Sequence, residues 1–161
     1  MNIPIRYLPK ILSQKDYKKQ KKNILKSRKL YKKSIYYTRP KVSSFHSKPS
    51  NHIQNAEKIY NLQKILPNKD LSIKTGCSIN ALEKIVNKGR GAYFSSGSRP
   101  NQTAESWGIA RLASAVTGGK SSIVDYHILH NGCKKNSKAL KFANQTCKKY
   151  EKCKKYTMKN H

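Results

Sequence analysis

The sequence predicts a mainly α-helical protein in which a small helical core is joined to basic segments at both ends. In the middle third, apolar residues recur at the spacing of a helix, and no region is rich in predicted strands. Hydrophobic residues make up only 36% of the chain, less than the roughly 45–50% usual in globular proteins. We therefore expect an extended basic arm at residues 1–50, a small helical core domain at 51–135 and a basic C-terminal helix at 136–161.

Positive charge dominates the composition. The chain has 35 Lys and Arg against 7 Asp and Glu, for a net charge of +28, and residues 1–50 alone hold 15 basic residues and one acid, Asp16. Like charges on one compact body repel each other, so we expect the protein to bind an acidic partner. Nucleic acid, an anionic membrane surface and acidic faces of other proteins all meet this requirement.

The first 50 residues are predicted to be an extended arm that becomes ordered on its partner. Between residues 14 and 37, apolar side chains such as Ile24 stand singly among lysines, and like charges three and four positions apart oppose an isolated helix. Pro40 and Pro49 then interrupt regular structure. The basic side chains expected to contact the partner are Lys18, Lys19, Lys21, Lys22, Arg28, Lys29, Lys32, Lys33 and Arg39.

Two helices are predicted early in the core domain. Apolar residues approximate a helical face from Asn55 to Leu66, where Pro67 ends the element. A second, shorter helix is expected from about Asn80 to Asn87, because a capping residue precedes it and a glycine follows it.

The most distinctive stretch is GRGAYFSSGSRPNQTAESWGIARLASAVTGGK, which begins at Gly89. Its first part contains three glycines, Gly89, Gly91 and Gly97, and predicts a tight loop. Glycine-rich loops can cradle phosphate through backbone N–H groups, and Arg90 and Arg99 lie close by in the sequence. The phosphate-loop pattern GxxxxGK[ST] is absent, so a buried turn is the favoured interpretation.

A helix is predicted to follow this loop, to begin after Thr103 and to end at the pair of glycines that precedes Lys120. Trp107 is expected to hold the core, with Tyr93 and Phe94 of the preceding loop packed against its helix. Arg111, on the same helix, is a further expected partner contact. A short element at residues 123–130 and a basic helix from residue 136 to about 156 complete the prediction.

The sequence favours a protein without enzymatic activity, cofactor or small-molecule substrate. A nucleophilic triad could be assembled only from dispersed residues, namely Ser95, Ser96 or Ser98 with His127 or His130 and Asp125. No nucleophile-elbow pattern GxSxG accompanies them, so structural polar roles are favoured. The seven acids are scattered among lysines, which keep them ionised and unsuited to proton transfer.

The four cysteines leave two possibilities open. Cys77, Cys133, Cys147 and Cys153 lack the close CxxC-like pairs of a structural zinc site, so no metal is expected. Disulfides are one possibility, for instance between Cys133 and either Cys147 or Cys153, in a protein assembled under oxidising conditions. Buried free thiols are the other.

Basic segments interleaved with tyrosines suit nucleic acid. In YKKQKKNILKSRKLYKKSIYY, which begins at Tyr17, lysines can neutralise phosphates and aromatic rings can stack on unpaired bases. Such binding would be sensitive to salt and without sequence preference. The sequence has no run of about 18 apolar residues and no secretory leader at its start, so neither a membrane-spanning helix nor signal-directed secretion is expected.

The sequence also resembles an uncharacterised family encoded by large DNA viruses of algae and protists. The similarity is carried by Asp16-x-x-Lys-x-x-Lys, Ser27-Arg28-Lys29-Leu30-Tyr31-Lys32 and Tyr36-Tyr37-Thr38-Arg39, and above all by KGRGAYFSSGSRPNQTAESWGIARLASAVTGGKSSIVDYHIL from Lys88. The Gly-Ser-Arg-Pro and Ser-Trp-Gly parts of this core also resemble some phage proteins.

The resemblance implies a viral origin and a place in the virion, with no established catalytic motif. It suggests a minor capsid protein that lies beneath the main shell and ties capsomers together through extended basic arms. Its expected partners are then the major capsid protein and other minor capsid proteins, and in addition nucleic acid or an anionic inner membrane. The alternative is a virion protein that condenses or packages the genome.

Overall fold

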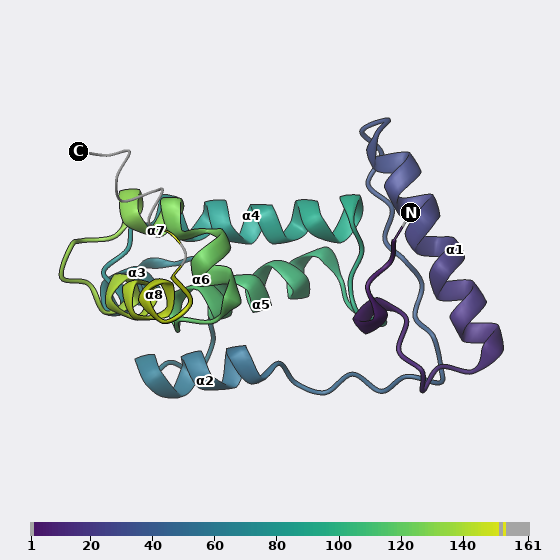
Figure 1. Ribbon diagram of the computed structural model, residues 1–161, viewed down its shortest axis with the longest axis horizontal. Coiled ribbons are helices and arrows are strands. Elements are labelled where there is room, and N and C mark those ends of the chain that lie inside the picture. Colours follow the sequence, from purple (N-terminus) through teal and green to yellow (C-terminus); the bar gives the residue numbers. More distant parts are fainter. Residues whose placement is uncertain (1, 152, 154–161) are drawn as a thin grey trace. The chain divides into compact units, whose positions relative to one another are not determined.

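The computed structural model describes residues 2–151 and 153, and this part of the chain is mainly α-helical (Figure 1). It contains eight α-helices, one 3-10 helix at Ile5–Tyr7 and no β-sheet, which confirms the predicted fold class. None of the helices within it is both long enough and apolar enough to cross a membrane.

The chain forms two compact units whose boundaries differ from the predicted ones. We call residues 1–48 with 88–108 the N-terminal unit, and residues 49–87 with 109–161 the helical unit. Helices α4 (Ile79–Ser95) and α5 (Ala104–Val116) each contribute residues to both. The predicted arm is therefore part of a unit that also contains most of the distinctive glycine-containing stretch.

Helix α1 (Gln14–Tyr31) replaces most of the predicted extended arm. It begins at Ser13, whose hydroxyl accepts a hydrogen bond from the Asp16 amide. Four residues on successive turns form a narrow buried stripe, namely Asp16, Gln20, Ile24 and Ser27. The expectation was wrong because this stripe is mostly polar: its members make hydrogen bonds to other parts of the unit, and that packing outweighs the repulsion between lysines.

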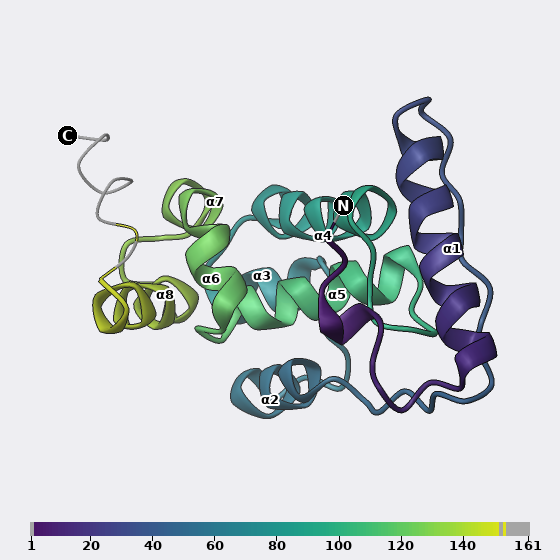
Figure 2. The ribbon, with the colours of Figure 1, turned by 45° about the vertical axis from the view of Figure 1, so that its right-hand side comes forward.

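The segment after α1 runs back along the helix (Figures 1 and 2). The Tyr37 hydroxyl donates to the Asn23 side chain at 3.1 Å, and the Lys19 ammonium donates to the Lys41 carbonyl at 3.1 Å. Further along, the side-chain amide of Asn101 accepts a hydrogen bond from the Val42 N–H at 2.7 Å and donates one to the Val42 carbonyl at 3.1 Å. These bonds fix the returning segment in place without a sheet.

Asp16 joins the start of α1 to this returning segment, because its carboxylate accepts hydrogen bonds from both the hydroxyl and the amide of Ser44. These two bonds hold the pKa of Asp16 below its ordinary value. A carboxyl whose pKa is lower in the folded chain stabilises the fold above its unfolded pKa of about 3.9. That contribution is lost as the pH falls through the folded pKa.

We therefore expect the free energy of unfolding of the wild type to fall more steeply between about pH 5 and pH 2 than that of Asp16→Asn. Urea unfolding followed by the fluorescence of Trp107, the only tryptophan in the chain, reports on this unit. Asp70→Asn, at an exposed position of the helical unit, is the matched control. Parallel pH profiles for wild type and Asp16→Asn would contradict the expectation.

The predicted glycine loop is shorter than expected, because Gly89 and Gly91 lie within α4. A Cβ atom at Gly89 would stand 2.5 Å from the Cα atom of Gly108 on α5, so the two backbones approach each other at this pair. Only Gly97, with φ of 133°, lies in the loop and has a backbone conformation that favours glycine.

The three aromatic residues assigned to the core have different environments. Tyr93 is fully buried, as expected, whereas Phe94 and Trp107 are only partly buried. Trp107 packs its ring edge-on against Tyr7, with centroids 5.9 Å apart. Trp107 is thus at the margin of the core of the N-terminal unit.

The helical unit is built from the first part of α4, the last part of α5 and five further helices. These five are α2 (Asn51–Tyr60), α3 (Lys69–Thr75), α6 (Lys120–Val124), α7 (Tyr126–Gly132) and α8 (Lys138–Lys149). Leu71, Leu82, Leu112 and Leu129 are fully buried in its core, beside alanines that permit close packing. The predicted short element at 123–130 is thus divided between α6 and α7. Helix α8 starts close to the predicted residue 136 but ends at Lys149, earlier than the predicted residue 156, because Tyr150, Glu151 and Cys153 are not helical. Residues 152 and 154–156 lie outside the described part.

Two disulfides close the helical unit, with pairs that differ from the ones suggested. Cys77 is bonded to Cys133, and Cys147 to Cys153. Cys77 and Cys133 face each other in a single antiparallel bridge, flanked by bonds from the Ser78 amide to the Gly132 carbonyl (2.8 Å) and from the Lys134 amide to the Gly76 carbonyl (2.9 Å). Directly opposed residues in such a bridge lie close together, so pairing across it replaces the suggested pairing of Cys133 with Cys147 or Cys153.

Candidate nucleic-acid interface

Seven lysines occupy the exposed side of α1, opposite its buried stripe. A helix that buries one narrow stripe leaves the rest of its circumference in water, and 18 residues give it a length of about 27 Å. We call this surface the lysine face, and it consists of Lys15, Lys18, Lys19, Lys21, Lys22, Lys26 and Lys29. Lys32 and Lys33 continue it beyond the end of the helix and are also exposed.

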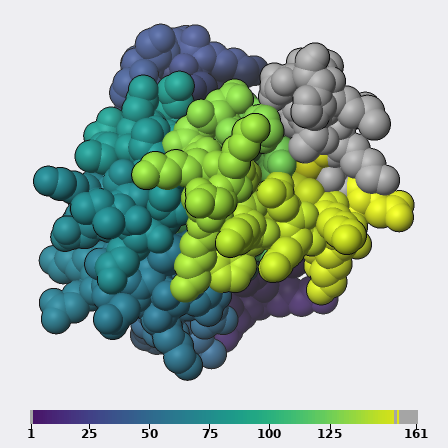
Figure 3. Space-filling model, turned by 90° about the vertical axis from the view of Figure 1, so that its left-hand side faces the viewer, coloured from purple at the N-terminus to yellow at the C-terminus, as the bar shows by residue number. Residues whose placement is uncertain are grey.

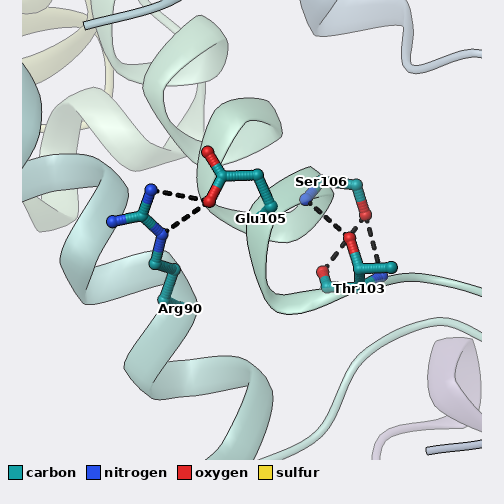
Figure 4. Close-up of polar contacts among 4 residues, drawn as sticks. All are labelled: Arg90, Thr103, Glu105 and Ser106. Carbon is teal, nitrogen blue, oxygen red and sulfur yellow. Dashed lines mark hydrogen bonds and ion pairs between the residues drawn. The ribbon is translucent and has the colours of Figure 1, made fainter. Parts of the chain in front are cut away.

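The positive charge of the N-terminal unit is not balanced within the unit. Its two stretches hold 18 Lys and Arg against two acids, Asp16 and Glu105, a net charge of +16. Asp16 lies in the buried stripe and is hydrogen-bonded to Ser44. Glu105 forms an ion pair with Arg90 at 2.6 Å, beside the Thr103 cap that opens α5 (Figure 4). In the described part of the unit, neither carboxylate is ion-paired to the lysine face, and of its seven lysines only Lys19 helps, through its charge, to lower the pKa of Asp16.

Aromatic rings lie beside the last turn of the lysine face. Tyr36 is 67% exposed and its ring centroid is 6.1 Å from that of Tyr31, which is 37% exposed. Tyr36 also contacts Phe94, with centroids 5.2 Å apart. Exposed aromatic faces next to cations are what single-stranded nucleic acid uses for stacking.

Two arginines predicted to contact a partner instead hold the protein together. Arg39 is only 6% exposed. Its guanidinium donates to the Tyr93 carbonyl at 2.7 Å and to the hydroxyls of Ser27 and Ser98 at 3.0 and 2.8 Å. It also stacks 3.7 Å from the Tyr93 ring centroid, and burial lowers the pKa of Arg39. A buried side chain with these contacts is part of the core, so the prediction for Arg39 was wrong.

Arg111 is the second of these residues. Its guanidinium makes two hydrogen bonds of 2.8 Å to the carboxylate of Asp125, which is fully buried, and these bonds raise the pKa of Arg111. Of the remaining predicted arginines, Arg28 is partly buried and donates to the Ser96 carbonyl at 2.8 Å, and Arg90 pairs with Glu105. Arg99 is exposed.

The polar groups of the glycine-serine segment are used within the fold, which does not favour a phosphate cradle there. The Ser98 hydroxyl accepts from Arg39 and donates to the Arg99 carbonyl at 2.8 Å. Asn101 binds the returning segment, as described above. Both carboxylate oxygens of Asp125 likewise accept hydrogen bonds from Arg111. No cluster of potential metal ligands occurs among the described residues.

Comparison with known proteins places the chain in a family. A family model described as a family of unknown function, DUF5824, matches residues 4–138. The chain belongs to DUF5824. No curated protein and no solved structure matches it.

The DUF5824 match includes all of α1 and all of the glycine-containing stretch, so the lysine face lies inside the family region. Sequence reasoning identified most of its lysines but did not identify the helix that gathers them on one surface. The available signal was the helical spacing of four residues other than lysine, the polar residues at 16, 20 and 27 and the apolar Ile24.

Proposed function

We propose that this protein is a non-enzymatic virion protein that binds nucleic acid, and that the lysine face of α1 holds the phosphate backbone. One observation carries the proposal. The N-terminal unit has a net charge of +16, and its two acids are bound to Ser44 and Arg90, so the charge of the seven lysines on α1 is largely unbalanced within the unit.

The physical basis is neutralisation of phosphates with release of counterions, which gives binding that weakens as salt rises. Along the axis of duplex DNA, phosphate charges follow one another more closely than the lysines along α1 do. Several lysines spread over about 27 Å can therefore contact phosphates at the same time. Tyr31 and Tyr36 would add stacking on unpaired bases. Binding would also relieve the repulsion within the unit and so raise its stability.

Replacing Lys18, Lys21, Lys22 and Lys29 by glutamine is expected to weaken binding to a 30-base-pair duplex and to a 30-base single strand at least tenfold near 0.1 M salt. Each lost phosphate contact lowers the magnitude of the slope of log K against log salt by about 0.9 for a duplex and about 0.7 for a single strand. Loss of four contacts should therefore lower it by about 3.6 and about 2.8, respectively. Fluorescence anisotropy over a series of salt concentrations measures both quantities.

The matched control removes the same charge from the helical unit, with Lys58, Lys64, Lys120 and Lys141 replaced by glutamine; all four are exposed. We expect this control to keep most of the wild-type slope. If the two variants lose affinity equally, net charge and not the lysine face governs binding, and the proposal fails.

A second candidate function is the minor capsid protein implied by the viral resemblance. The two disulfides favour it, because disulfides persist in oxidising settings that include the surfaces of virions. The extended arm no longer supports it, since α1 occupies most of that segment. Extraction of purified virions with rising salt and mild detergent, followed by mass spectrometry, separates the two: release with the genome supports nucleic-acid binding, retention in the emptied shell supports the capsid role, and absence from virions contradicts both.

A further inference from the structure

In the helical unit, α3 and α4 are joined by only three residues. Helix α3 ends at Thr75 and α4 begins at Ile79. Gly76 has φ of 79°, and its Cβ position would be 2.5 Å from the Cβ of Ser137, so the turn requires glycine. The Ser78 hydroxyl then accepts from the Ala81 amide at 3.1 Å and caps α4. A short turn that contains glycine between two helices is one feature of a helix-turn-helix.

The inner faces of the two helices form one core. Leu71 and Thr75 of α3 and Leu82 and Ile85 of α4 are all fully buried, and Cys77 in the turn is 2% exposed. The Cys77–Cys133 disulfide bonds the turn covalently to the residue that follows α7. A Cβ at Gly132 would be 2.3 Å from the Cβ of Ala81, so α7 lies directly against the start of α4. This rigid support leaves the opposite side of α4 in solvent.

The exposed side of α4 carries side chains suited to the edges of base pairs. They are Asn80, Glu83 and Lys84, which recur at helical spacing. In the major groove, asparagine pairs with adenine in a bidentate manner, lysine with guanine and glutamate with cytosine. These residues therefore offer donors and acceptors of the kinds that distinguish base pairs.

Exposed lysines also lie on α3 and next to the turn that precedes α4. Lys69 and Lys74 are exposed on α3, and Lys134 and Lys135 are exposed just after the disulfide. The Lys134 amide bonds to the Gly76 carbonyl at 2.9 Å, which brings this pair of lysines next to the turn. Figure 3 shows the teal residues of α3 and α4 beside the green residues that lead from α7 to α8, on the same face. Exposed lysines near the start of a recognition helix can contact the phosphates that border the groove.

We infer that α3 and α4 form a helix-turn-helix that binds duplex DNA, with α4 as the recognition helix in the major groove. The inference rests on the proposed function, because both require a nucleic-acid partner. It adds that the partner is duplex DNA, and that binding has a sequence preference that the lysine face cannot supply.

The test selects bound duplexes from a pool with about 20 randomised base pairs near 0.15 M salt, and then measures affinity for an enriched duplex and for a scrambled duplex of the same composition. We expect the wild type to prefer the enriched duplex at least about tenfold, since each good base contact gives about that discrimination. Asn80→Ala with Lys84→Ala is expected to reduce this ratio to near one and to change affinity for the scrambled duplex less than about threefold.

The matched control is Asn55→Ala with Lys58→Ala, the same residue types at exposed positions of α2 in the same unit. It should keep the full preference. The four-glutamine variant of the lysine face should lose affinity for both duplexes and keep their ratio. If no sequence is enriched, or if Asn80→Ala with Lys84→Ala keeps the ratio, the helix-turn-helix inference is overturned while the lysine face stands. If the lysine-face variant binds both duplexes as the wild type does, the proposed function falls instead, and a wild type that binds neither overturns both.

Discussion

Removal of the Cys77–Cys133 disulfide is expected to lower the free energy of unfolding of the helical unit by about 4 kcal/mol. The bond joins residues 56 positions apart and so closes a long loop. A crosslink of this kind restricts the unfolded chain more as the loop lengthens. The double variant Cys77→Ala with Cys133→Ala removes the bond without leaving a lone thiol, and denaturant unfolding followed by circular dichroism measures the change.

The second disulfide provides a comparison inside the same unit. Cys147 and Cys153 are only six positions apart, so their replacement by alanine is expected to cost about 2 kcal/mol. If the two double variants lose equal stability, loop closure is not the main contribution of these bonds. If the Cys77→Ala with Cys133→Ala variant shows no helical circular dichroism even without denaturant, its loss of stability is larger than expected but has the expected sign.

The sequence predicted the helical class well because the helical unit follows simple rules. The helix at 104–116 was predicted from its Thr103 cap, its apolar spacing and the glycines after its end, and all three are present. Residues that bury apolar side chains at helical spacing leave a local signal that requires no knowledge of their neighbours.

Helix α1 was not predicted because its signal is not local. Only Ile24 in its buried stripe is apolar, and the other members are held by bonds to distant residues, such as Ser27 to the Phe94 carbonyl at 2.9 Å. The lysines that oppose the helix are adjacent in sequence, whereas the side-chain contacts that stabilise it are with residues 13 to 78 positions away. The disulfide pairs were missed for the same reason, since the bridge that brings Cys77 to Cys133 exists only after folding.

The candidate site was predicted in part. Basic residue types at positions 18–33 indicated a polyanion partner, and most of these side chains are exposed on one helix. Arg39 and Arg111 could not be separated from them, because a sequence does not show which guanidinium finds a buried carbonyl or carboxylate. The polar side of α4 was not singled out, because its residues are ordinary surface types until the turn before them is seen.

Gly89→Ala is expected to lower the free energy of unfolding of the N-terminal unit by about 3 kcal/mol. Its added methyl group would be 2.5 Å from the Cα atom of Gly108, and backbone atoms in a helix cannot give way as a flexible side chain can. Helices α4 and α5 would have to separate locally, which loosens the packing around Tyr93 on the same helix. Urea unfolding followed by Trp107 fluorescence measures the effect, because Trp107 precedes Gly108 directly.

Gly91→Ala is the matched control, since it makes the same chemical change two residues along the same helix. Its added methyl group would meet only the Tyr31 hydroxyl, at 3.8 Å, which is an ordinary contact. Alanine is favoured over glycine inside a helix by about 0.5–1 kcal/mol, so this variant should be slightly more stable than the wild type. Opposite signs at positions 89 and 91 would show that glycine is required at 89 for the close approach of α4 and α5, and that it meets no steric requirement at 91. Destabilisation of equal size at both positions would instead indicate that the helix itself, and not its contact with α5, is intolerant of the change.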